Sequence, residues 1–116
     1  MRVELIALRS KLIERGEDLV KAIISAAREA GVTLLDGDIV AVSVKVVSIS
    51  TGAVRSLSGV VPSSQAASLS KVTDLDPRFV ELAIRESDAV FGACRGSLLT
   101  LKGFELVPNA GVDLKN

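Results

Sequence analysis

Residues 76–108 read "DPRFVELAIRESDAVFGACRGSLLTLKGFELVP", and this stretch decides the fold class because a helical pattern passes directly into three strand patterns. Asp76 and Pro77 predict the start of the helix, since an aspartate side chain accepts backbone N–H groups and proline presets the next φ angle. Apolar side chains then recur at helical spacing, at Phe79, Val80, Ala83 and Ile84. The runs "DAVFGA", "SLLTLK" and "FELVP" predict three short strands, with turns at Gly96 and at Lys102-Gly103.

The chain upstream of this stretch predicts two more helices. Apolar side chains recur at helical spacing from Asp18 to Ala30, and Gly31 is a suitable C-terminal cap. Pro62 is expected to open a second helix that continues to Ser70, because proline is tolerated at the first helical position. Together with the helix that follows Asp76, about three helices are expected.

Two further strands are predicted in the first half of the chain. Arg2–Leu8 reads "RVELIAL", which is rich in β-branched and apolar residues. Ile39–Ser50 reads "IVAVSVKVVSIS" and has the strongest strand pattern of the chain, with valines at positions 40, 42, 44, 46 and 47. Strands at both ends with helices between them predict an α+β fold with a mixed or antiparallel sheet. The length of 116 residues predicts one domain over residues 1–116.

The composition excludes several classes of function. Fourteen basic residues balance fourteen acidic ones, and Trp and Tyr are absent, so neither a nucleic-acid partner nor an anionic membrane partner is expected. Without histidine, Ser-His-Asp and Cys-His catalysis are excluded, and a zinc site is not expected. The lone Cys94 is expected to be a small buried hydrophobe. A charged N-terminus and the lack of an apolar run of ~18 residues predict a cytoplasmic protein.

The last eight residues, "NAGVDLKN", contain both asparagines of the chain. This stretch resembles the N-A-G-[IV]-D-x-S-N signature of the coenzyme F-420 gamma-glutamyl ligases, which add glutamate to coenzyme F-420-0 using GTP. The stretches "MRVELIAL…LIERGEDL", "DGDIVAVSVKVVS" and "DPRFVELAIRESDAV" are similar to that family's elements in the same order, so the resemblance covers the whole chain. Taken by itself, "NAGVDLKN" is also compatible with a polar tail that forms an Asx-type turn.

The resemblance implies a nucleotide site and a metal. Mg²⁺ or Mn²⁺ would neutralise the phosphates of GTP while an acyl phosphate forms and the amine of glutamate attacks it. By resemblance, Asp113 would be a metal ligand and Asn116 a nucleotide contact. The remaining residues implied at the GTP site are Ser10, Lys11, Leu12, Ile13, Val44 and Lys45. A lysine on a valine-rich strand is more often a solvated or snorkelling side chain than a phosphate contact, and this alternative stays open for Lys45. No catalytic residue is assigned.

The sequence also departs from the family pattern. Ile49 follows Ser48 where the family usually has lysine, and Lys115 replaces the serine of the terminal signature. The family's "PSERA" is "PSSQA" here, and the later half of the family's sequence is missing. The chain is therefore predicted to be the N-terminal part of a ligase, incomplete by itself, acting as a homo-oligomer or with a partner chain. The alternative is a non-catalytic nucleotide-binding or oligomerising relative that kept the fold.

Overall fold

The computed structural model describes residues 1–114, and the chain divides into two compact units, Met1–Arg55 and Ser56–Asn116. Over residues 1–114 it contains four α-helices and a three-stranded antiparallel sheet, which confirms the predicted α+β class. The expected single domain stays a prediction. None of the helices within residues 1–114 combines the length and the apolar character that crossing a bilayer requires.

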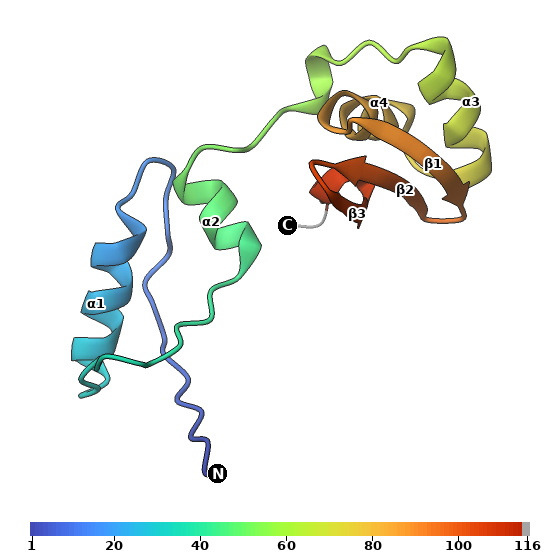
Figure 1. The fold of residues 1–116 in the computed structure, drawn as a ribbon. Coiled ribbons are helices and arrows are strands. Elements are labelled where there is room, and N and C mark those ends of the chain that lie inside the picture. The colour runs from blue at the N-terminus through green and yellow to red at the C-terminus, as the bar shows by residue number, and fades with distance from the viewer. Residues whose placement is uncertain (115–116) are drawn as a thin grey trace. The chain divides into compact units, whose positions relative to one another are not determined.

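The second unit contains the sheet (Figure 1). Its strands are β1 (Ala89–Cys94), β2 (Ser97–Lys102) and β3 (Glu105–Pro108), in the order β1-β2-β3, so β2 is central. Both connections are tight hairpin turns, and Gly96 and Gly103 adopt positive φ angles of +83° and +62° there. The three predicted strands are confirmed, because each pairs with its neighbour in sequence.

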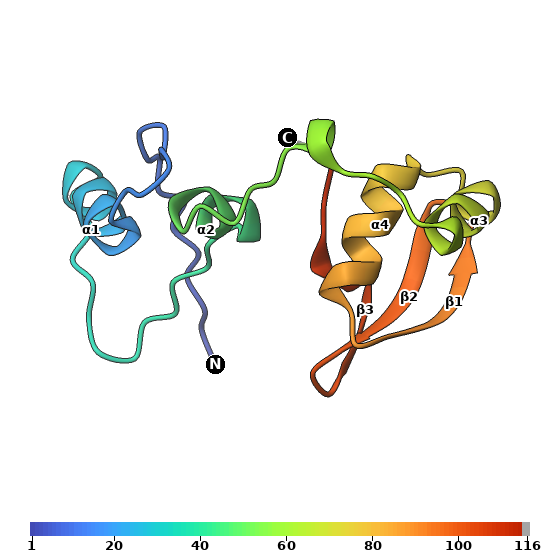
Figure 2. The same cartoon turned by 90° about the horizontal axis from the view of Figure 1, so that it is seen from above.

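Two helices, α3 (Ser64–Thr73) and α4 (Pro77–Glu86), cover one face of this sheet (Figure 2). Asp76 caps α4 as predicted, since its Oδ1 accepts the backbone N–H of Arg78 at 2.8 Å. The other helix begins after Ser63 rather than at Pro62. The buried side chains between the helices and the sheet are those of Ala66, Val80, Ala83 and Leu98.

Buried Glu81 on α4 clamps the start of α3. Its carboxylate accepts the backbone N–H of Ser63 at 2.8 Å and the Nε of Arg85 at 2.7 Å. Hydrogen bonds from Ser63 and then from Arg85 lower the pKa of Glu81 from 4.5 to about 2. The clamp therefore connects two helices of the core through one charged group.

Replacement of this carboxylate should make stability depend less on pH. Because the pKa of Glu81 is lower in the folded state, its contribution is complete above pH 4.5 and is lost as the pH falls towards 2. Glu81→Gln should therefore lower the free energy of unfolding at pH 7, with a difference from wild type that shrinks below pH 4.5. Denaturant unfolding from pH 7 to pH 2 measures this, with exposed Glu105→Gln as the control. A difference that is constant over this range would contradict the clamp.

The first unit contains α1 (Leu19–Glu29) and α2 (Val44–Ser50), with the N-terminal segment running between them (Figures 1 and 2). The predicted helix is confirmed: the side chain of Asp18 accepts the backbone N–H of Lys21 at 3.1 Å, and Gly31 follows with a φ of +68°. The buried face of α1 consists of Ala22, Ala26 and Ala27.

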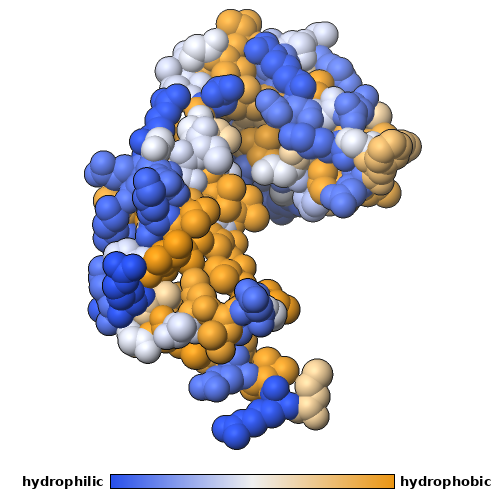
Figure 3. All heavy atoms as spheres, turned by 60° about the vertical axis from the view of Figure 1, so that its left-hand side comes forward, coloured by the Kyte–Doolittle hydropathy of each residue, from blue (hydrophilic) through white to orange (hydrophobic). Residues whose placement is uncertain are grey.

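Both strands predicted in the first unit are wrong. Residues 2–8 form no strand, residues 39–43 have no regular secondary structure, and Val44–Ser50 is helical. A strand needs an adjacent strand to satisfy its backbone, and none is present within residues 1–55, whereas a helix satisfies these groups locally. Consequently many apolar side chains of the predicted strands are exposed, among them Leu5 and Ile39, and apolar side chains gather on the surface of this unit (Figure 3).

Candidate functional site

A cavity of about 200 Å³ lies in the first unit between the N-terminal segment, α1 and the start of α2. The backbone N–H of Gly16 donates to the carbonyl of Ser50 at 2.9 Å and ties the end of the segment to the end of α2. The cavity is lined by Leu8, Ser10, Ile13, Leu19, Ala22, Ile23, Ala26, Val40, Ala41, Val42, Ser43 and Val46. Apart from the two serine hydroxyls, these side chains are apolar.

The cavity includes half of the loop that was predicted to contact nucleotide. Ser10 and Ile13 belong to its wall, and Ile13 is buried. Lys11 and Leu12 are exposed and do not line it. The structure therefore divides the predicted loop into two residues that shape the cavity and two that lie outside it.

Val44 and Lys45, in the first turn of α2, are exposed and do not line the cavity either. Their neighbours Ser43 and Val46 do, and the sequence analysis missed both. Residues three apart share one face of a helix, whereas strand alternation places positions 43 and 46 on opposite faces. A helical interpretation of "SVKVVS" would have identified this pair.

Lys11 forms an ion pair within its own loop. Its Nζ lies 2.6 Å from Oε1 of Glu17, whose other oxygen accepts the backbone N–H of Glu14 at 3.0 Å. The hydrogen bond between the two side chains raises the pKa of Lys11 and lowers that of Glu17. Because the Lys11 side chain is 71% exposed, this pair is screened by solvent and contributes little to stability. An incoming phosphate would compete with Glu17 for the ammonium group.

In the second unit, Asp113 follows a turn built from three consecutive residues with positive φ angles. Asn109, Ala110 and Gly111, which form the 3-10 helix η2, have φ values of 52°, 52° and 76°. Asparagine and glycine tolerate this conformation, whereas alanine pays about 1–2 kcal/mol for it. The turn must therefore be held by its surroundings.

Two buried groups of β2 hold the turn. Oδ1 of Asn109 accepts the backbone N–H of Leu98 at 2.8 Å. Oγ1 of Thr100 accepts the backbone N–H of Ala110 at 2.7 Å and donates to the carbonyl of Val107 at 2.6 Å. The letters "NAG" in the terminal motif thus have a structural role, and Asp113 is exposed just beyond them. Asn116, predicted to contact nucleotide, lies outside the described residues.

Comparison with known proteins identifies the family of the chain. The family model described as F420-0:Gamma-glutamyl ligase matches residues 7–116. The chain belongs to this ligase family. Proteins named coenzyme F420:L-glutamate ligase are similar to it in Methanothermobacter thermautotrophicus, at 36% identity over 107 residues, and in Methanopyrus kandleri, at 34% over 117 residues. These alignments cover 90% and 100% of this chain but 42% and 44% of the relatives, so the chain spans less than half of their length.

The nucleotide and the metal implied by the resemblance stay predictions, and the fit of the described residues to each can be examined. A cavity of about 200 Å³ is smaller than the ~300–1,000 Å³ typical of ligand sites, so it would accommodate only part of a nucleotide. Its apolar wall suits a base better than phosphates. Asp113 offers the oxygen donor that Mg²⁺ and Mn²⁺ prefer, but within residues 1–114 no three acidic or cysteine side chains cluster to hold an ion. The carboxylate of Asp113 is therefore a suitable type of ligand, but one carboxylate is too few to hold the ion.

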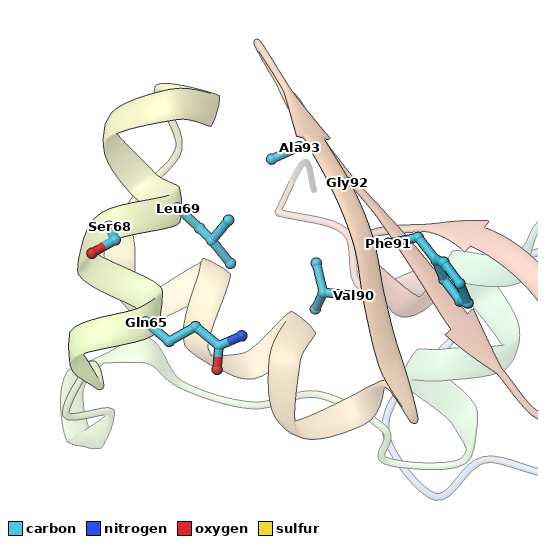
Figure 4. A pocket seen from close by; sticks show the side chains of 7 residues that line it. All are labelled: Gln65, Ser68, Leu69, Val90, Phe91, Gly92 and Ala93. Carbon is cyan, nitrogen blue, oxygen red and sulfur yellow. The ribbon is translucent and has the colours of Figure 1, made fainter.

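A second hollow, of about 400 Å³, lies between α3 and β1 in the second unit (Figure 4). It is lined by Gln65, Ser68, Leu69, Val90, Phe91, Gly92 and Ala93, none of which was predicted as a site residue. Leu69, Val90 and Ala93 pack against the core, and the Phe91 ring points away from α3. The hollow is therefore the open edge of the core. At the end of β1, Cys94 is exposed, which corrects the expectation of a buried cysteine.

Proposed function

We propose that the chain forms part of a GTP- and metal-dependent ligase that joins glutamate to coenzyme F420-0 through an acyl phosphate. The observation that supports this most strongly is the family match over residues 7–116. The names of the similar proteins supply the substrate class. The cytoplasmic location expected from the sequence stays a prediction.

The first unit is proposed to contribute to the GTP site. Ser10 and Ile13 on one side, and Ser43 and Val46 on the other, enclose a mostly apolar space suited to a base. Lys11, adjacent to Ser10 in the sequence, would supply positive charge for phosphate oxygens once it leaves Glu17. When GTP is bound with Mg²⁺ or Mn²⁺, the metal would neutralise phosphate charge.

The second unit is proposed to contribute Asp113 as one metal ligand. Formation of an acyl phosphate requires stabilisation of charge on several phosphate oxygens, and a single carboxylate does not hold Mg²⁺ against water. The further ligands would come from the nucleotide and from a second copy or a partner chain. We therefore expect ligation to require residues beyond those of this chain.

The alternative is a non-catalytic relative that binds nucleotide or oligomerises. One observation favours it: Ile49, at the position where the resemblance implies a lysine, is half-buried on α2 and provides no ammonium group for phosphates. This alternative and the ligase both allow GTP to bind. They differ in product formation, since only the ligase yields glutamylated coenzyme.

Substitution of Lys11 tests the nucleotide site. Lys11→Met should weaken GTP binding about ten- to a hundredfold, because a hydrogen bond to a charged group contributes about 1.5–3 kcal/mol. Isothermal titration calorimetry with Mg²⁺ and GTP measures the change. Lys21→Met is the matched control, since Lys21 is an exposed lysine of the same unit that also pairs with a carboxylate, that of Asp18. If both variants bind GTP as wild type does, the loop around Lys11 does not contact phosphates.

A further inference from the structure

The turn before Asp113 is anchored to the most constrained strand of the sheet. Thr100 lies on β2, between β1 and β3, and its side chain is fully buried. Its hydroxyl is used in both directions: it accepts the N–H of Ala110 at 2.7 Å and donates to the carbonyl of Val107 at 2.6 Å. A valine at this position would keep the shape of the side chain and remove both hydrogen bonds.

Asn109 provides a second anchor, one residue before Ala110, which Thr100 holds. Its Oδ1 accepts the N–H of Leu98, another fully buried residue of β2, at 2.8 Å. A third, weaker contact joins Nζ of Lys102 to the carbonyl of Ala110 at 3.5 Å. The turn is thus fastened to one strand at Asn109 and Ala110, the first two residues of its left-handed stretch.

Only Val112 lies between this turn and Asp113. The backbone N–H of Val112 donates to the carbonyl of Asn109 at 2.9 Å, and Val112 is extended, with φ −76° and ψ 135°. The direction in which the chain leaves the turn therefore determines where the backbone of Asp113 lies. Loss of an anchor would release strained backbone at Ala110, because its positive φ angle is unfavourable without support.

We infer that Thr100 and Asn109 are positioning residues, which hold the Asn109–Gly111 turn on β2 and thereby fix the Asp113 carboxylate for a divalent cation. The assignment of a cation to Asp113 rests on the proposed function. The positioning of Asp113 rests on the hydrogen bonds and burial of the turn. Neither Thr100 nor Asn109 needs to touch the cation or the nucleotide in this role.

A matched control in the same unit separates the positioning of Asp113 by Thr100 from a general effect of Thr100 on stability. Thr73 is also fully buried, and its Oγ1 donates to the carbonyl of Leu69 at 2.9 Å. Thr73→Val should therefore lower stability in a similar way to Thr100→Val without affecting the turn. Thr100→Ser keeps the hydroxyl and should preserve the position of Asp113.

The first test measures backbone order at Asp113 by ¹⁵N relaxation of the 116-residue chain. We expect an order parameter of about 0.85 in wild type, Thr73→Val and Thr100→Ser, and one below about 0.6 in Thr100→Val. Asn109→Gly, which tolerates a positive φ but lacks the acceptor, should also lower it, and it serves if Thr100→Val does not fold. Wild-type order at Asp113 in Thr100→Val, or in Asn109→Gly where that replaces it, would overturn the inference.

The second test adds Mn²⁺ and GTP and follows paramagnetic broadening of the Asp113 amide. Broadening should require about tenfold more Mn²⁺-GTP in Thr100→Val than in wild type or Thr73→Val. Equal broadening in Thr100→Val and wild type would overturn the role towards the cation. If wild type shows no broadening at Asp113, the proposed metal ligand is wrong, whereas the order parameters still decide whether Thr100 and Asn109 position the turn.

Discussion

Leu98→Ala is expected to lower the free energy of unfolding of the Ser56–Asn116 unit by about 2–5 kcal/mol. Leu98 is fully buried on β2 and packs in the core with Ala66, Val80 and Ala83. Two of these neighbours are alanines, which cannot extend into the space that a lost leucine side chain leaves. The cost should therefore lie towards the upper part of that range, because the cavity term grows when the surroundings do not collapse.

Leu99→Ala is the matched control for this core substitution. Leu99 is the next residue on the same strand, on the opposite face, and is 45% exposed. Its replacement should cost under about 1 kcal/mol, since much of its apolar surface already contacts water. Urea unfolding, followed by circular dichroism of both variants, gives the two values. Equal losses for Leu98→Ala and Leu99→Ala would show that this core does not stabilise the unit.

The second unit could be predicted from the sequence because its determinants are local. The cap at Asp76 and Pro77, the apolar stripe of α4 and the turns at Gly96 and Gly103 all act between residues close in the chain. Each strand of the sheet pairs with its neighbour in sequence, so short hairpin patterns are sufficient to place the strands.

The first unit was harder to predict because strand formation there depends on a distant partner. The valine-rich run at residues 39–50 fits a buried strand, but a short apolar run also fits a helix, and periodicity alone does not separate the two. The structure has a helix from Val44, so Ser43 and Val46 line the cavity in place of the predicted Val44 and Lys45. The wrong secondary structure thus separated the predicted positions Val44 and Lys45 from the cavity, while their role at a nucleotide site stays a prediction.

The anchors of the Asp113 turn were invisible in the sequence for a related reason. The "NAG" motif is recognisable by itself, whereas Thr100 sits in a strand with no feature that separates it from other small polar residues. Its importance arises from the hairpin, which places its hydroxyl against Ala110, ten residues later. A contact that depends on strand register is determined by the folded sheet rather than by local pattern.

Asp113→Asn is expected to reduce ligation by about 10²–10³-fold in a reconstituted enzyme, whereas the pure 116-residue chain should give no product at all. The assay combines this chain with the remaining portion of the Methanothermobacter relative and supplies coenzyme F420-0, glutamate, GTP and Mn²⁺. Asparagine keeps the size of the side chain but removes the charge through which a carboxylate stabilises a cation beside phosphate oxygens. The lower ligation activity should therefore result from the missing charge at the metal and not from unfolding.

Glu105→Gln controls for a general loss of negative charge, because Glu105 is an exposed carboxylate on β3 of the same unit. It should ligate glutamate at the wild-type rate. If Asp113→Asn is as active as Glu105→Gln, Asp113 is not a metal ligand, and the terminal motif is retained for its turn alone. If the mixture with wild-type chain forms no glutamylated coenzyme while GTP still binds, the non-catalytic alternative is correct. That alternative differs from the ligase because it binds nucleotide without transferring glutamate.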